Sequence, residues 1–146
     1  MVENILDIIL VEDNPCDIEM TLDALKENNL ANRVRIFRNG EEAVNYIFKQ
    51  GEDCNVDICA HPTVILLDLN LPKIDGLEIL RRIRSDERTK KIPIVVLISS
   101  RLDKDRIESY NLGVNSYIVK PVDFENFTKA VAEIGYYWVV LNKPPY

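Results

Sequence analysis

The sequence lacks three features that would assign it to large classes of proteins. Its longest apolar run extends only from Ile92 to Ile98, whereas a membrane-spanning helix needs about 20 apolar residues. Its first residues contain no basic segment followed by an apolar stretch, so no signal peptide is visible. It also lacks an excess of basic residues, because its net charge is -6. These absences exclude a membrane span and argue against a nucleic-acid-binding face.

Cysteine and histidine are also scarce, with 3 Cys and 1 His in the chain. The arrangement of Cys54, Cys59 and His61 matches no common zinc-binding spacing, and no fourth ligand is evident. Cysteines in a chain without a secretion signal are typical of free thiols in a reducing compartment. We therefore expect a cytoplasmic protein whose cysteines are incidental, and a loop over residues 51–62.

The length of 146 residues suits one domain with a single core. Apolar residues make up 47% of the chain and charged residues 29%, which is ordinary for a folded globular protein. No linker, repeat or low-complexity segment divides the chain. We expect one domain over residues 1–146 with no attached output domain, ending in an extended last helix and a proline-rich tail at about 129–146.

Short apolar runs alternate with segments of helical periodicity along the whole chain. The runs expected to form strands are Leu6–Val11, Val34–Phe37, Val64–Leu67, Pro93–Ile98 and Ser116–Val119. Three helices are expected to begin after Asn14, after Gly40 and near Gly76. Two more are expected over Asp103–Leu112 and about Phe124–Leu141. Five strand–helix units in a row predict an α/β fold with a doubly wound parallel sheet covered on both faces.

Charged and hydroxyl side chains follow four of the expected strands, at their carboxyl ends. Ligands of such sheets bind outside the carboxyl ends of the strands, so these side chains should lie close together. The residues at the carboxyl ends are Glu12, Asp13, Asp68, Ser99, Ser100 and Lys120. The pattern predicts a functional site built from carboxylates, hydroxyls and one ammonium group.

Three carboxylates placed together repel one another unless a cation neutralises them. Mg²⁺ suits such a site because it takes oxygen ligands and keeps several waters. Asp68 ends a strongly apolar strand, where an unpaired charge is costly; we expect Lys120 and a metal to hold it. A carboxylate held in this way can act as a nucleophile towards phosphorus and form an acyl phosphate.

These residues together resemble the receiver domain of two-component response regulators. The resemblance rests on Glu12-Asp13, on Asp68-Leu-Asn-Leu-Pro with Asp75-Gly76, and on Lys120-Pro121. It covers nearly the whole chain and implies the flavodoxin-like receiver fold with strand order 2-1-3-4-5. The Val-Glu-Asp-Asn-Pro start and the Trp138…Lys-Pro-Pro tail are most similar to stand-alone, phytochrome-associated regulators.

The resemblance also implies a role for individual residues. Asp68 would accept a phosphoryl group from a histidine kinase. A phytochrome-like kinase is one candidate donor. Asp13 and Asp68 would bind Mg²⁺ directly, Glu12 through water, and Asn70 through its backbone carbonyl. Lys120 would contact the phosphoryl group, and the Lys120-Pro121 peptide would be cis. Tyr117 matches the aromatic switch position of the family.

One position departs from the family pattern. Receiver domains usually carry Thr or Ser at the end of the fourth strand, where its hydroxyl binds the phosphoryl group. Counting from Asp68 or back from Lys120, this position falls on Ile98, and Ser99 comes next. Either a bulge brings Ser99 into place or the switch hydroxyl is missing, and we favour Ile98 at the position. Phosphorylation itself would not depend on the outcome.

The last helix carries apolar and aromatic residues around its whole circumference. A terminal helix of this kind needs a second surface to bury against, and two-fold pairing of identical chains is the commonest solution. We therefore expect a homodimer whose interface includes Tyr136, Tyr137, Trp138 and Val140. The alternative is a helix with exposed tyrosines.

Two functions of different class remain open from the sequence. The first is a phosphorylation-dependent signalling switch. It would change dimerisation or partner binding through the surface of its fourth helix, fifth strand and fifth helix. Its only chemistry would be its own phosphotransfer and dephosphorylation, so it would not be an enzyme in the usual sense. The second is an interaction module of the same fold whose output no longer needs phosphate, an alternative that Ile98 keeps open. A flavin site is disfavoured by Glu12-Asp13 after the first strand, and a phosphatase by Asn70 two residues after Asp68.

Overall fold

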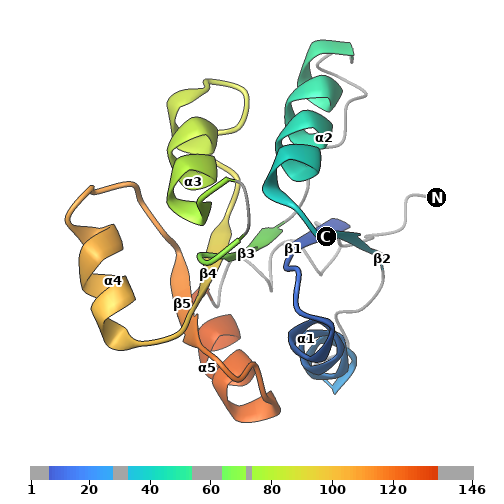
Figure 1. The fold of residues 1–146 in the computed structure, drawn as a ribbon, viewed down its shortest axis with the longest axis vertical. Coiled ribbons are helices and arrows are strands. Elements are labelled where there is room, and N and C mark those ends of the chain that lie inside the picture. The colour runs from blue at the N-terminus through green and yellow to red at the C-terminus, as the bar shows by residue number, and fades with distance from the viewer. Residues whose placement is uncertain (1–6, 28–32, 54–63, 72–73, 135–146) are drawn as a thin grey trace, which may run out of the picture.

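The computed structural model describes residues 7–27, 33–53, 64–71 and 74–134. Within these residues, strands and helices alternate strictly along the chain (Figure 1). The strands are β1 (Asp7–Val11), β2 (Arg33–Phe37), β3 (Val64–Asp68), β4 (Ile94–Ile98) and β5 (Ser116–Val119). The helices are α1 (Pro15–Glu27), α2 (Gly40–Asp53), α3 (Gly76–Ser85), α4 (Arg101–Glu108) and α5 (Phe124–Ile134).

The strands form one parallel sheet in the order β2-β1-β3-β4-β5. This confirms the doubly wound α/β fold and the order that the resemblance implied. Every residue of β3 and β4 is buried, which explains why their sequences are continuous apolar runs rather than alternating ones. All five carboxyl ends lie at the same edge of the sheet, where the predicted site residues follow the strands.

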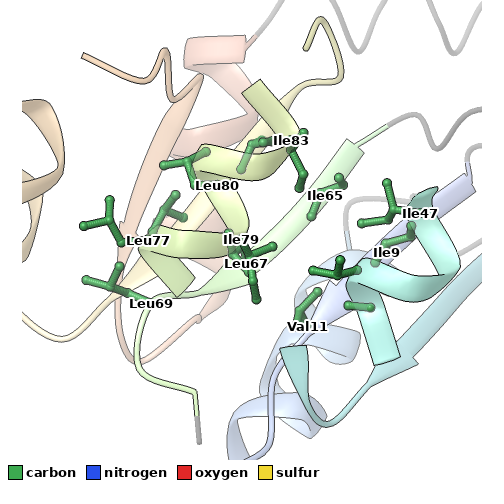
Figure 2. Packing of buried hydrophobic residues seen from close by; sticks show 14 of the residues in the cluster. Ile9, Val11, Ile47, Ile65, Leu67, Leu69, Leu77, Ile79, Leu80 and Ile83 are labelled. Carbon is green, nitrogen blue, oxygen red and sulfur yellow. The ribbon is translucent and has the colours of Figure 1, made fainter. Parts of the chain in front are cut away.

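The sheet separates two hydrophobic cores. Helices α1 and α5 cover one face, and their side chains pack on alternate strand residues such as Leu10 and Leu66 (Figure 1). Helices α2, α3 and α4 cover the other face and pack on the intervening residues, such as Val11 and Leu67. Figure 2 shows this second core, in which α2 and α3 side chains meet those of β1 and β3.

Two helix starts show why the chain folds locally as it does. The side chain of Asn14 accepts hydrogen bonds from the backbone N–H groups of Cys16 and Asp17, and Pro15 occupies the first position of α1, as expected for an N-cap followed by proline. Asp75 caps α3 in the same way by accepting from Leu77 N. Both caps stand where a loop that begins at the carboxyl end of a strand enters a helix.

Two predicted boundaries are wrong. Helix α2 continues to Asp53, so the predicted loop over 51–62 begins too early; glycine in a helix costs about 1 kcal/mol relative to alanine and need not end it. Helix α4 covers Arg101–Glu108 rather than Asp103–Leu112. The chain leaves the helix through Asn111 and Gly113, which both have positive φ angles, a conformation that glycine and asparagine adopt most readily.

Several expectations concern residues outside those described. They include Cys54, Cys59 and His61, the predicted end of the last helix at Leu141, and the predicted interface residues Tyr136, Tyr137, Trp138 and Val140. No helix in the described part of the chain is both long enough and apolar enough to cross a membrane.

Candidate functional site

The carboxyl ends of three strands bring an ammonium group against two carboxylates. Asp68 is the last residue of β3, while Glu12 and Lys120 directly follow β1 and β5. Lys120 Nζ lies 3.0 Å from Glu12 Oε1 and 3.2 Å from Asp68 Oδ1. Because Glu12 and Asp68 are buried, these ion pairs offset the cost of burying a carboxylate charge at the end of an apolar strand.

Glu12, Asp13 and Asp68 form a cluster of oxygen donors. One carboxylate oxygen from each residue lies within 4.8 Å of the other two. Asp13 is exposed while the other two are buried, so the cluster opens to solvent on the side of Asp13. A set of oxygen donors with an open side suits a hard divalent cation that keeps part of its water shell, and the single charge of Lys120 does not neutralise three carboxylates.

The protonation behaviour of the cluster reflects this excess of negative charge. Burial raises the pKa of Glu12 to about 7, with a further contribution from the adjacent Asp68 carboxyl and an opposing one from Lys120. Burial alone would lower the pKa of Lys120, but its close contact with the Glu12 carboxylate and the charge of Asp68 raise it above the usual lysine value. Lys120 therefore stays charged, and Glu12 binds a proton at higher pH than an ordinary glutamate does.

Asp17 completes the surroundings of Lys120, and sequence reasoning gave this residue no role. Its Oδ2 lies 3.1 Å from Lys120 Nζ, although the two residues are far apart in the sequence. Asp17 stands in the first turn of α1, where acidic residues are common because they favour the helix N-terminus. Nothing in the local sequence distinguishes it from such a surface residue.

The turn after β3 fixes the main chain around Asp68. The backbone N–H of Asn70 donates to Asp68 Oδ1 over 3.1 Å, and Gly76 N donates to the carbonyl of Leu69 over 3.0 Å. A side chain at Gly76 would meet backbone atoms of Asp68 and Leu69 at 2.5 to 2.9 Å. The Asp75-Gly76 pair therefore lets α3 start directly against the residue that carries the carboxylate.

The end of β4 distinguishes Ile98 from Ser99. Ile98 is the last residue of an unbroken strand and is fully buried in the second core, together with Ile107 of α4. Ser99 is exposed, and its hydroxyl oxygen accepts a hydrogen bond of 3.2 Å from the Asn70 side chain. The register with β3 and β5 contains no bulge, so the strand places an apolar side chain at position 98.

Two further family features are visible beyond the strand ends. The Lys120-Pro121 peptide is cis, as the resemblance implied. Tyr117 lies on β5, packs against the second core, and has Lys104 Nζ 5.4 Å from its ring centre. Its position between β5 and α4 agrees with the place expected for the switch aromatic, and its part in switching stays a prediction.

Comparison with known proteins gives consistent matches over nearly the full chain. Residues 8–132 match the response regulator receiver domain. The chain is 37% identical over 139 residues to a probable methanogenesis regulatory protein of Methanothrix harundinacea, FilR2, with 94% of this chain and 86% of the relative covered. It is 39% identical over 132 residues to the response regulator Rcp1 of Synechocystis sp., covering 90% of this chain and 88% of Rcp1.

Solved structures of phytochrome-associated regulators are similar in both sequence and fold. The bacteriophytochrome response regulator RtBRR is 47% identical, with a TM-score of 0.82 over 96% of this chain and 84% of that one. The phosphorylated cyanobacterial phytochrome response regulator RcpA is 37% identical, with a TM-score of 0.70 over 97% and 99%. The Mn²⁺-bound form of Rcp1 is 36% identical, with a TM-score of 0.68 over 94% and 95%. This chain belongs to the response regulator receiver domain family and is close to its phytochrome-associated members.

Proposed function

We propose that this protein is a signalling switch that accepts a phosphoryl group on Asp68 from a histidine kinase. Receiver domains are signalling proteins rather than enzymes in the usual sense, and they pair with histidine kinases. The observation that carries the proposal is the Asp68 carboxylate, buried at the carboxyl edge of the sheet, with Lys120 Nζ 3.2 Å from its Oδ1. A structural carboxylate at this place would not need both a lysine and a cluster of further carboxylates.

The proposed step is an exchange of bonds at phosphorus. An Asp68 oxygen attacks the phosphorus of a phosphohistidine, an O–P bond forms, and the P–N bond to the imidazole breaks as the ring nitrogen leaves. Lys120 stays beside the reacting oxygens and offsets the negative charge that gathers on the phosphoryl group. Water later attacks the phosphorus of the acyl phosphate, the O–P bond to Asp68 breaks, and inorganic phosphate leaves, which regenerates the Asp68 carboxylate.

We propose that the site binds Mg²⁺, which Asp13 and Asp68 would hold directly, Glu12 through water, and Asn70 through its backbone carbonyl. When bound, the ion supplies positive charge against the carboxylates and the phosphoryl oxygens. The oxygen-only donor set with an exposed member supports this assignment. A related regulator, Rcp1, has been solved with Mn²⁺ bound, an ion that prefers the same kind of ligands.

The output that we propose is a change in self-association or partner binding in the cytoplasm. The surface formed by α4, β5 and α5 would change on phosphorylation, with Tyr117 as the moving side chain, and the homodimer would use Tyr136, Tyr137, Trp138 and Val140. The kinase would be phytochrome-like if the similarity to RcpA and RtBRR extends to the input. The comparable identity to a probable methanogenesis regulator favours no single stimulus.

A second candidate function is an interaction module that works without phosphate. The specific observation in its favour is Ile98, which is buried in the second core where the family usually has a hydroxyl. Against it stand the carboxylates and Lys120, all in the arrangement that phosphoryl transfer needs. Ser99 and its hydrogen bond to Asn70 offer a nearby hydroxyl, which weakens the case further.

The experiment that separates the two candidates is intact mass measurement after treatment with a small acyl phosphate and Mg²⁺. We expect one phosphoryl adduct on the wild type, none on Asp68→Asn, and one on Asp105→Asn, which removes an exposed carboxylate of α4 as a matched control. Adducts on Asp68→Asn as well would mean that another residue is the acceptor. No adduct on the wild type, with Mg²⁺ bound and with a histidine kinase also tested, would favour the module that works without phosphate.

A further inference from the structure

The ammonium group of Lys120 lies among three carboxylates. It has three N–H donors, and three carboxylate oxygens lie within reach: Glu12 at 3.0 Å, Asp17 at 3.1 Å and Asp68 at 3.2 Å. Lys120 is itself mostly buried, with 18% of its side chain exposed. Of these three contacts, the one to Asp17 has the geometry of a hydrogen bond, whereas Glu12 Oε1 has no hydrogen-bond partner. A phosphoryl oxygen on Asp68 would therefore compete for Lys120 mainly with Asp17.

Asp17 is the partner that can be given up at the lowest cost. Its side chain is 20% exposed, against 0% for Glu12 and 2% for Asp68, so water can replace the lost hydrogen bond at Asp17 only. A buried carboxylate that loses its cation is strongly destabilised, whereas a partly exposed one is rehydrated. Asp17 also lies outside the group of carboxylates whose oxygens converge on the candidate metal position.

The position of Asp17 is set independently of Lys120. Its backbone N–H donates to the Asn14 side chain, and its backbone carbonyl accepts from the buried hydroxyl of Thr21. Both bonds lie within the start of α1 and fix the backbone of its first turn. The helix thus places the Asp17 carboxylate next to Lys120, and the backbone bonds of the first turn do not depend on this ion pair.

We propose that Asp17 is a positioning residue that holds Lys120 in the unphosphorylated state and releases it when Asp68 carries a phosphoryl group. This inference rests on the proposed function of Asp68. The Asp17–Lys120 ion pair stabilises the resting state, because a phosphoryl group on Asp68 would attract the same ammonium group. An interaction made in one of two states shifts the equilibrium towards that state, so Asp17 limits the phosphorylated fraction.

The test compares phosphorylation of the wild type, Asp17→Asn, Asp17→Glu and Asp23→Asn by a small acyl phosphate with Mg²⁺. Asp23 is an exposed carboxylate on the same helix, so Asp23→Asn removes the same charge without touching Lys120. We expect Asp17→Asn to raise the ratio of the phosphorylation rate to the hydrolysis rate by about threefold to tenfold, which corresponds to roughly 0.7–1.4 kcal/mol. Asp17→Glu should return the ratio towards that of the wild type, and Asp23→Asn should leave it near the wild type.

A second readout needs neither metal nor phosphate. Ammonium protons of lysine give an NMR signal when hydrogen bonds slow their exchange with water, and the signal of Lys120 can be assigned by its loss in Lys120→Arg. In the metal-free protein we expect this signal to weaken in Asp17→Asn and to persist in Asp23→Asn. An unchanged signal, or equal rate ratios for the two Asn variants, would overturn the role of Asp17. Absence of any adduct on the wild type would instead overturn the proposed function on which that role rests.

Discussion

Gly76 lies so close to Asp68 that a Cβ atom on the glycine would stand 2.5 Å from the Asp68 carbonyl oxygen. The contact joins the first residue of α3 to the last residue of β3. The atoms that this Cβ would meet belong to the backbone, so no side chain could move aside to relieve the contact. The conformation of the chain at Asp68, the proposed phosphorylation site, therefore depends on residue 76 having no side chain.

Gly76→Ala should accordingly destabilise the protein by about 2–3 kcal/mol, because the added methyl group forces backbone atoms apart. Gly40→Ala is the matched control: Gly40 also begins a helix, and its Cβ would also meet an atom at 2.5 Å, but that atom is the terminal methyl of Ile79. We expect less than about 1 kcal/mol for this control. Urea denaturation of both variants measures the difference, and equal costs would contradict the argument.

The raised pKa of Glu12 makes the stability of the metal-free protein depend on pH. The pKa is about 7 in the folded protein against an ordinary value of 4.5, so the folded state binds more protons than the unfolded state between these values. The free energy of unfolding should therefore fall as pH rises from about 4.5 to 7. The fall attributable to Glu12 is on the order of 2–3 kcal/mol.

Denaturation in the presence of a chelator, at pH 5 and pH 8, tests this dependence. Glu12→Gln should lose most of the difference between the two pH values, whereas Glu19→Gln, an exposed acid on α1, should keep it. Mg²⁺ should reduce the difference in the wild type, because a cation favours the ionised carboxylate. A wild type that is more stable at pH 8 than at pH 5 without metal would contradict the assignment.

Position 98 should behave as a core position. Ile98→Val should cost about 1 kcal/mol for the lost methylene. Ile98→Thr has the same shape as the valine variant but buries a hydroxyl, so it should cost roughly 1–3 kcal/mol more. Thermal or urea unfolding of the pair measures the contribution of the hydroxyl alone. Equal stability of the two variants would mean that the side chain at 98 faces the polar site and not the second core.

Arg84 should be more important for stability than the other two arginines of α3, Arg81 and Arg82. Its guanidinium donates to the backbone carbonyls of Leu112, Gly113, Lys90 and Ile92 and to the side chain of Asn115. It thereby ties the end of α3 to the segments that lead into β4 and β5. Hydrogen bonds from a charged donor contribute about 1.5–3 kcal/mol each, although not additively.

We expect Arg84→Met to destabilise the protein by about 3 kcal/mol. Arg82→Met is the matched control, because Arg82 is exposed and forms only a surface ion pair with Glu78 among the contacts of the described residues. Its loss should cost under about 1 kcal/mol. Chemical denaturation of both variants measures the two costs. Similar effects of the two substitutions would show that the carbonyl contacts of Arg84 contribute little.

The parts of the site that lie directly after strands could be predicted from the sequence. Asp68 and Lys120 stand at fixed places because parallel strands bring their carboxyl ends to one edge, and the apolar strand before Asp68 marks its charge as exceptional. Asp17 could not be found in this way, since an acid in the first turn of a helix needs no further explanation. Arg84 was equally hidden, because most of its partners are backbone carbonyls, which carry no sequence signature.

The boundary errors have a similar origin. Gly51 suggested the end of a helix, but a single glycine weakens a helix without ending it, and α2 includes it. The helix was expected to reach Leu112, yet the chain leaves it at Glu108, and Leu112 packs against the second core from outside the helix. Side-chain periodicity reports which residues are buried, and a residue can be buried from a loop as well as from a helix.

The sheet lies between the charged residues of the candidate site and the two residues proposed for switching, Ile98 and Tyr117. Strand alternation places Glu12, Asp68 and Lys120 in line with Leu10, Leu66 and Ile118, whose side chains belong to the α1 and α5 side. Ile98 and Tyr117 belong to the opposite side, under α2, α3 and α4. If Asp68 is phosphorylated as proposed, the added charge stands on the α1 and α5 side of the sheet, while the side chains of Ile98 and Tyr117 lie on the other side. Any response of these two residues would then have to cross the thickness of the sheet.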